Sequence, residues 1–540
     1  MIPLIYRYFG RSRVERAGDA YALTLSPNLA RPPVSFDAEL AQPLRFREAI
    51  SALHDVVMSD LRFKPRDHTA YREWLKKQQQ EEGRVRVAAY AHAKQELAEK
   101  RAAGGAPPDL DRQFGRWHRI YWAARRSYAD YLRRNDPDLF RYLMPCDPVI
   151  TVAPDVVFFE CFSRDESSYG CLTVERDAMF KGASSVQLGT TNVDYSWALY
   201  DHFQQLRTYR PTRFHVDPGG FDVRIAEAGG VREEKIDLPE TWLRGFMQIQ
   251  AAMTLPSRKV SLDRESVYSV LAFLRRHKAR RSPRALRFDL SPGRAPALEI
   301  LPWGHRVESR TTRWEGNAQS VKVFGRQRLL VLGRLLPIVE GIDVYLLGDG
   351  LPTFWVARMG PMRLTLGLSG WTVNDWTRAS ALDLMAPKAA VAGPTVKAFA
   401  EALESRQTMR DTEFGAQPEV ARGALYKLAR LGQCIQDLHA GVVRWRRVMP
   451  PEVAVEKYVP ENEEAIASRG LSVRIERDEK LPSGLRVLAG KAATVPVEAL
   501  LDADGVFKRA KCNCSHFFTG GLRKGPCRHL LALRTAAINP

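Results

Sequence analysis

Four residues near the C-terminus have the types and the spacing of a metal site. Cys512 and Cys514 are followed after twelve residues by Cys527 and His529, which gives the pattern C-x-C-x12-C-x-H. Three thiolates and one imidazole complete a tetrahedral zinc shell, with bonds of roughly 2.3 Å to sulfur and 2.0 Å to nitrogen. Because this shell leaves no coordination position free, the pattern predicts a structural Zn²⁺ site rather than a catalytic one.

Two other interpretations of these residues stay open at this point. His516 is a rival ligand because it lies two residues after Cys514, and the cysteines could also be unconnected buried thiols. The chain has only 7 cysteines in 540 residues, so three of them beside a histidine favour a shared ion. Cys161, Cys171 and Cys434 have no partner at metal-ligand spacing, and we expect them to be buried thiols.

The local elements must bring the two ligand pairs together. Residues 497–514 (VEALLDADGVFKRAKCNC) contain two β-type runs joined at an Asp/Gly turn, which predicts a hairpin leading into the first pair. Side chains two apart on a strand share a face, so both sulfurs can point at one ion while Asn513 faces away. The glycine-rich segment that follows can fold back. Pro526 then suits the first turn of a helix that carries the second pair.

This unit resembles the SWIM-type zinc finger, whose pattern is C-x-C, a gap of variable length and C-x-H, preceded by a β-hairpin. The resemblance extends over about 45 residues of the chain. It implies Zn²⁺ at Cys512, Cys514, Cys527 and His529, and a module that binds DNA or protein.

A second resemblance concerns the chain outside the finger. Residues 157–172 (VFFECFSRDESSYGCL) and 422–438 (RGALYKLARLGQCIQDL) are similar to bacterial SWIM proteins encoded beside a MoxR-type AAA ATPase and a von Willebrand A protein. This resemblance implies an adaptor role, with the AAA ATPase or the von Willebrand A protein as the partner.

The chain carries a large basic excess, with 81 Lys and Arg against 62 Asp and Glu and a formal net charge of +19. Such an excess is typical of proteins that bind a polyanion, most often nucleic acid. Arginine contributes 62 of the 81 basic residues, so a GC-rich bacterial genome accounts for part of the excess.

Apolar segments and cysteine usage favour a cytoplasmic protein without membrane contact. No apolar run approaches the roughly 20 residues of a membrane span. The first residues lack the basic and then apolar pattern of a signal peptide. The scattered cysteines form no disulfide framework.

Changes in composition along the chain predict an α+β multidomain protein. We expect a mostly helical N-terminal region at 1–147, with helices near 70–103 and 112–132. Short β-branched and aromatic runs separated by helices predict a mixed α+β region at 148–385.

The C-terminal part is predicted to hold two further domains. Residues 393–450 have the helix–helix–β-ribbon order of a winged helix-turn-helix. A Glu/Pro-rich linker at 451–464 separates them from the ββα SWIM-type zinc finger domain at 466–540.

The winged-helix candidate carries basic residues that would suit DNA. Three fall on its second helix and three on its ribbon: Arg422, Lys427, Arg430, Arg444, Arg446 and Arg447. A recognition helix beside a basic ribbon would contact a groove and phosphates. A winged helix used only for protein contacts, or no winged helix at all, is the alternative.

Sequence motifs favour a binding protein over an enzyme. The chain has no P-loop, no G-x-S-x-G, no H-E-x-x-H and no kinase motif set, and its acidic residues nominate no nuclease site. We therefore expect a non-enzymatic zinc protein that engages nucleic acid. The alternative function is a protein–protein adaptor in a bacterial AAA ATPase/von Willebrand A system.

Overall fold

The computed structural model describes several stretches of the chain: residues 6–9, 13–17, 20–25, 34–59, 148–163, 165, 167–193, 203–204, 206–207, 211–216, 232–235, 240–279, 282–310, 312–370, 391–448, 463–503, 505–538 and scattered positions between 95 and 135. The chain divides into two units, one of residues 1–59 with 145–540 and one of residues 60–144. In the second unit the described positions are helical, in agreement with the helices predicted there.

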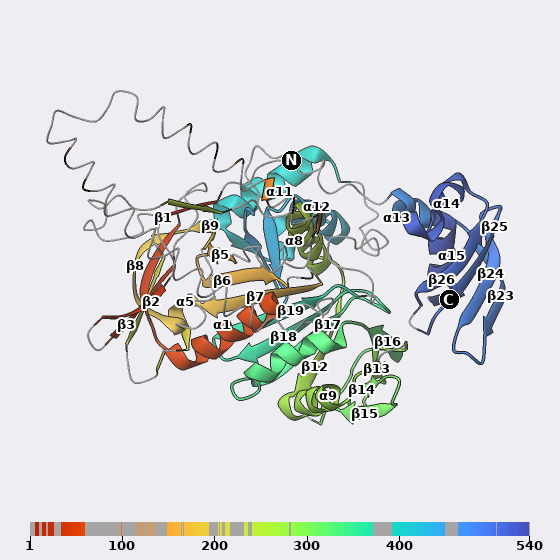
Figure 1. Ribbon diagram of the computed structural model, residues 1–540, viewed down its shortest axis with the longest axis horizontal. Coiled ribbons are helices and arrows are strands. Elements are labelled where there is room, and N and C mark those ends of the chain that lie inside the picture. The colour runs from red at the N-terminus through yellow and green to blue at the C-terminus, as the bar shows by residue number, and fades with distance from the viewer. Residues whose placement is uncertain are drawn as a thin grey trace. The chain divides into compact units, whose positions relative to one another are not determined.

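The largest sheet of the first unit has eight antiparallel strands (Figure 1), in the spatial order β12-β17-β18-β19-β7-β6-β5-β9. Their bounds are β5 Val149–Val152, β6 Val156–Phe162, β7 Ser168–Glu175, β9 Gly189–Asn192, β12 Arg258–Asp263, β17 Gly341–Leu346, β18 Thr353–Met359 and β19 Met362–Leu368. Most of these strands are the β-branched and aromatic runs from which the sequence predicts strands. Nearly all of their side chains are buried, because helices cover both faces.

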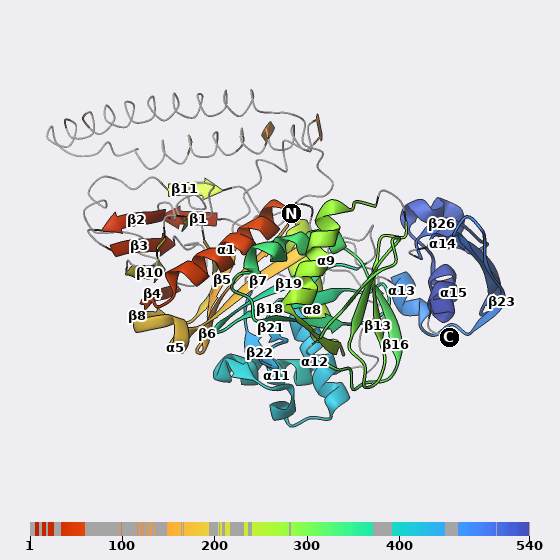
Figure 2. The same cartoon turned by 90° about the horizontal axis from the view of Figure 1, so that it is seen from below.

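Figure 2 shows α1 and α9 on one side of these strands and α11 and α12 on the other. The first face is covered by α1 (Pro43–Met58), α9 (Arg264–Arg276) and the 3-10 helix η1 (Arg326–Leu335), and the second by α8 (Glu240–Met253). Gly245 of α8 lies against the ring of Phe162, so the helix approaches the sheet closely. None of the described helices is long and apolar enough to cross a membrane.

The N-terminal region contains strands as well as helix. β1 to β4 precede α1, and three of them join β8 and β10 in a five-stranded sheet of order β2-β3-β10-β4-β8. The bounds are β1 Tyr6–Phe9, β2 Arg13–Ala17, β3 Ala20–Leu25, β4 Ser35–Leu40, β8 Phe180–Gln187, β10 Thr212–Val216 and β11 Arg232–Lys235, which pairs with β1. The prediction of a mostly helical region is therefore wrong for the described residues among 6–40. β1, β3 and β4 pair with β11, β10 and β8, which lie far along the chain, so local patterning does not reveal them, whereas β2 pairs with the adjacent β3.

A four-stranded sheet of order β15-β14-β13-β16 accompanies α9. Its strands are β13 Leu286–Leu290, β14 Ala297–Ile300, β15 His305–Glu308 and β16 Gln319–Val323. Asp263 caps α9, because its carboxylate accepts a hydrogen bond from the backbone N–H of Ser266 at 2.7 Å. The same carboxylate accepts bonds from Ser309 and Arg310, which directly follow β15. These bonds tie the start of α9 to the end of β15.

Residues 393–445 form helices and a ribbon where the sequence predicts them. The elements are α11 Gly393–Arg406, β20 Thr408–Met409, η2 Asp411–Phe414, α12 Pro418–Arg430, β21 Cys434–Asp437 and β22 Val442–Trp445, and the sheet order is β20-β22-β21. The short strand β20 and the 3-10 helix η2 are additions to the predicted order. α12 packs against α8, and seven of its thirteen residues are buried.

Buried ion pairs join the β21–β22 ribbon to the large sheet. Arg446 Nη2 lies 2.5 Å from Glu160 Oε1 on β6, and neither side chain is exposed. The same carboxylate oxygen accepts hydrogen bonds from Tyr169 Oη at 2.6 Å and from Gln250 Nε2 at 3.1 Å. The ribbon is therefore held by a charged and fully buried network.

A second network surrounds Asp437 at the end of β21. Its carboxylate pairs with Arg363 of β19 and with Arg444, each at 2.5 Å, and Arg444 also pairs with Asp155. Burial alone would raise the pKa of Asp437, but the two guanidinium groups outweigh burial and lower this pKa to about 2. Asp437 is thus ionised at neutral pH and balances cations from two elements.

The C-terminal residues 463–538 have a core of their own. Four strands in the order β23-β24-β25-β26 carry helices on one side. The elements are α13 Glu463–Ser468, β23 Val473–Lys480, β24 Arg486–Ala492, β25 Val495–Leu501, β26 Phe507–Cys512, α14 Ser515–Gly520, η4 Gly521–Lys524 and α15 Arg528–Ile538. The predicted hairpin and helix are present as β25, β26 and α15. The sheet has two more strands than the predicted ββα unit. We call residues 463–538 the C-terminal module.

Candidate metal centre

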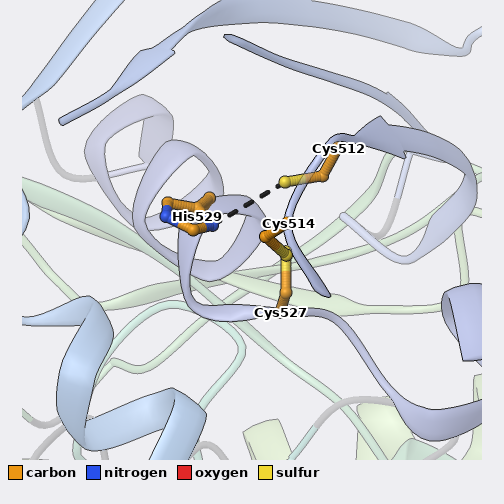
Figure 3. Close-up of side chains that lie close together, drawn as sticks. All are labelled: Cys512, Cys514, Cys527 and His529. Atoms are coloured by element: carbon orange, nitrogen blue, oxygen red, sulfur yellow. Dashed lines mark hydrogen bonds between the residues drawn. The ribbon is translucent and has the colours of Figure 1, made fainter. Parts of the chain in front are cut away.

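The four predicted ligands lie together at one end of the C-terminal module. Cys512 ends β26, Cys514 follows it, Cys527 directly precedes α15, and His529 lies in the first turn of that helix. Their side chains converge in Figure 3. One donor atom from each residue can be chosen so that all four atoms lie within 4.8 Å of one another. The fold therefore brings together the two pairs that the sequence keeps twelve residues apart.

This arrangement fits a tetrahedral ion. Arms of roughly 2.0–2.3 Å imply donor-to-donor distances of about 3.3–3.8 Å in a closed shell. Cys512 Sγ lies 3.7 Å from His529 Nδ1, and every other donor pair lies within 4.8 Å, so none has to close by more than about 1–1.5 Å. Three soft sulfur donors and an imidazole suit zinc better than magnesium or calcium, which prefer oxygen. The residues could thus hold one Zn²⁺.

Burial sets the protonation of the ligands before metal binds. Cys527 is fully buried, and this burial raises the pKa of its thiol to about 12. Burial also raises the pKa of Cys512, and it lowers the pKa of His529 so that the imidazole is neutral. Since a metal binds thiolate, loading the site releases protons, and metal affinity falls as the pH falls.

Backbone groups close to the sulfurs support thiolate. The N–H of Phe517 donates to Cys514 Sγ at 3.5 Å, which makes Cys514 the N-cap of α14. The backbone of Leu530, in the first turn of α15, hydrogen-bonds Cys527 and acts against the effect of burial on its pKa. The turns that follow the ligands therefore supply part of the outer shell around the ion.

Glu464 is a supporting residue that sequence reasoning missed. Its carboxylate accepts from the backbone N–H of Arg528 at 2.7 Å and from the guanidinium of the same residue at 2.6 Å. These hydrogen bonds lower the pKa of Glu464. A carboxylate at the N-terminus of α15 is also favoured by the helix dipole. Glu464 falls in the segment predicted to be a linker, and no local signal links it to a residue 64 positions later.

We expect Glu464→Gln to loosen the metal centre without abolishing it. The substitution removes the charge that caps α15 and binds Arg528, so the free energy of unfolding of the module should fall by about 1–2 kcal/mol. Competition with a chelator should show zinc leaving about tenfold more readily. Glu463→Gln is the matched control, because Glu463 is exposed beside it. Equal zinc retention in the two variants would contradict a role for Glu464.

The remaining predicted cysteines and His516 lie outside the site. His516 is not among the four residues whose donor atoms come together in the described part of the chain. Cys161, Cys171 and Cys434 are buried thiols, as predicted. Cys161 Sγ donates to the carbonyl of Leu53 in α1, so it belongs to the core of the first unit.

Comparison with known proteins leaves the family open. No protein-family model matches this chain, and no curated protein matches it. The proliferating cellular nuclear antigen of Entamoeba histolytica matches 42% of this chain and 90% of its own, at 10% identity and a TM-score of 0.29. The PCNA of A. fulgidus, solved with the C-terminal region of FEN-1 bound, matches 43% of this chain and 91% of its own, at 12% identity and a TM-score of 0.28. Neither likeness assigns a fold or a function.

Two of the three ribbon arginines, Arg444 and Arg446, are not part of a nucleic-acid surface. Arg444 and Arg446 are 2% and 1% exposed, and both form the ion pairs described above. Arg447 pairs with Glu404, and Lys427 donates to the carbonyl of Val391. The prediction that the ribbon contacts phosphates is therefore wrong for Arg444 and Arg446, because both are buried and form ion pairs with acids distant in the sequence.

Proposed function

We propose that this protein is a non-enzymatic binding protein whose C-terminal module is a SWIM-type zinc finger that engages nucleic acid. The observation that carries the zinc part is the convergence of three thiols and one imidazole within 4.8 Å. With four protein donors no coordination position is left for substrate, so the ion serves the fold. No enzymatic turnover is expected of this site.

Charge around the metal supports nucleic acid as the partner. Residues 505–529 contain six Lys and Arg and no Asp or Glu. Zinc with three thiolates carries a net charge near −1, so the surface stays basic after loading. Arg509 and Arg523 are exposed, and neither forms an ion pair with a described residue. These two arginines are free to meet phosphate.

Phe518 favours the second candidate function, a protein–protein adaptor in an AAA ATPase/von Willebrand A system. Its side chain is 88% exposed, on α14 between the two ligand pairs. A large apolar side chain left in water is a typical anchor for a protein partner. In the adaptor case Phe518→Ala would abolish capture of that partner, whereas loss of Arg509 and Arg523 would have little effect.

We expect salt-dependent binding of DNA that depends on the module. The logarithm of the affinity should fall linearly with the logarithm of the salt concentration, because bound cations release counterions. The double variant Arg509→Gln/Arg523→Gln should reduce the slope by about two. The measurement is fluorescence anisotropy of labelled duplex and single-stranded DNA at several salt concentrations.

The control removes equal charge at the opposite edge of the same sheet. Arg474→Gln/Lys480→Gln changes β23, whereas Arg509 lies on β26. This control variant should bind DNA as wild type does. Removal of residues 463–540 from wild type should weaken DNA binding strongly. Absence of binding by the full chain at about 50 mM salt would remove nucleic acid as the partner and leave the adaptor role.

A further inference from the structure

A row of stacked rings lies on the surface of the first unit, where α9 runs beside β14 and β15 (Figure 1). Phe273 is sandwiched between two imidazoles, with centroid distances of 4.3 Å to His305 and 4.0 Å to His277 and planes within 15° of parallel. Trp303 stands edge-on to Phe273 at 5.5 Å. We call His277, Phe273, His305 and Trp303 the aromatic stack.

The sequence places these rings by ordinary helix and hairpin geometry. Phe273 and His277 are four residues apart on α9 and so share a face. Trp303 lies in the loop between β14 and β15, and His305 is the first residue of β15. Burial alone would raise the pKa of Asp263, but its hydrogen bonds from Ser266, Ser309 and Arg310 lower that pKa to about 2. The carboxylate therefore stays ionised and keeps α9 alongside β15.

The aromatic stack is open to water at the end formed by His305. His305 is exposed and Trp303 is 38% exposed, whereas a stack formed only for the core would be covered. Within the described residues His305 contacts no ring other than Phe273, so its outer face has no ring on it. A further flat ring can extend the stack at this face.

Two cations without an ion pair in the described part of the chain lie at the same end of α9. Arg276 and Lys278 are exposed. The guanidinium of Arg275 lies instead against Gly333 of η1, on the other side of the helix from Phe273. The nearby acid on β15, Glu308, has its carboxylate held by Arg306 at 2.9 Å. Rings that can stack and cations that can meet phosphate therefore share one surface.

We propose that the aromatic stack with Arg276 and Lys278 binds single-stranded nucleic acid. Bases of a single strand are free to stack on exposed rings, whereas duplex bases are already stacked on each other. The proposal rests on the proposed function only in that the ligand is again nucleic acid. The surface and its residues are separate from the C-terminal module.

The stacking part is tested by a pair of substitutions at one position. His305→Ala removes the outer ring and should weaken binding of a labelled oligodeoxythymidylate of about 20 nucleotides by about 5-fold or more. His305→Phe keeps a ring without the imidazole nitrogens and should bind as wild type. A loss that His305→Phe does not restore would overturn stacking.

The charge part is tested by Arg276→Gln/Lys278→Gln. Two lost phosphate contacts should reduce the salt slope on the single strand by about 1.4. Arg264→Gln is the control, because Arg264 is exposed at the other end of α9 and pairs with Glu265. An unchanged slope in the double variant would overturn the proposal.

Two competitors separate this ligand from other polyanions. Poly-glutamate of matched charge should compete weakly, because it has no bases to stack, and equal competition would assign the surface to acidic peptide instead. Preference for duplex over single strand would also overturn the proposal.

Two variants distinguish failure of this proposal from failure of the proposed function. If Arg509→Gln/Arg523→Gln binds nucleic acid normally and His305→Ala does not, the nucleic-acid role of the C-terminal module is wrong and the role of the aromatic stack is retained. If His305→Ala binds normally and Arg509→Gln/Arg523→Gln does not, only the role of the aromatic stack is wrong.

Discussion

Purified wild-type protein should contain one zinc per chain, and Cys514→Ala or Cys527→Ala should reduce the content to near zero. Each substitution leaves three donors, and the apparent binding free energy of a structural zinc, about 10–16 kcal/mol, is largely lost with the closed shell. The loss should also unfold the module. Of the ten residues in its buried cluster, three are alanine and two are the ligands Cys512 and Cys527, so little apolar surface remains without the ion.

Elemental analysis and limited proteolysis measure these two effects. New cleavage sites should fall between residues 463 and 538. Within the first 448 residues, the cleavage pattern of the variants should match that of wild type. Asn513→Ala is the closest control, because Asn513 lies between two ligands and is exposed. Cys171→Ala and Cys434→Ala are further controls, because these thiols are buried in the large core outside the C-terminal module. Zinc retained in Cys514→Ala and Cys527→Ala, or absent from wild type purified without chelator, would disprove the site.

Glu160→Gln should lower the free energy of unfolding of the first unit by about 3–5 kcal/mol, because it leaves the Arg446 cation buried without a counter-charge. The side chains are nearly isosteric, so packing around Tyr169 and Gln250 is kept. The contact between the end of the ribbon and β6 should loosen, while the ion pairs of Asp437 with Arg363 and of Arg444 with Asp155 still join the ribbon to the sheet. Chemical denaturation followed by circular dichroism measures the change, and zinc content should stay at one.

Glu175→Gln is the matched control on the neighbouring strand. Glu175 also pairs with an arginine, Arg363, at 3.2 Å, but its side chain is 48% exposed, so the change should cost less than about 1 kcal/mol. The double variant Glu160→Met/Arg446→Met removes both charges and should recover much of the stability lost in Glu160→Gln. Equal stability of Glu160→Gln and Glu175→Gln would show that the buried pair does not hold the ribbon.

Local patterns were sufficient for the elements that depend on nearby residues. Most strands of the large sheet, and the helices and ribbon within residues 393–450, lie where alternation and turn residues predict them. The predicted metal ligands belong to the same class. Spacing of two residues on each side of a short gap restricts Cys512, Cys514, Cys527 and His529 to one hairpin and one helix, and the fold brings these four residues together.

Tertiary structure decided the features that depend on partners far along the chain. β1, β3 and β4 form beside strands that lie far along the chain, namely β11, β10 and β8. The sequence predicts phosphate contacts for Arg444 and Arg446, but in the structure they are buried and form ion pairs with Asp155 and Glu160. The identity of a basic side chain does not say which acid neutralises it. That depends on which strands meet, since a charge can leave water only beside an opposite charge.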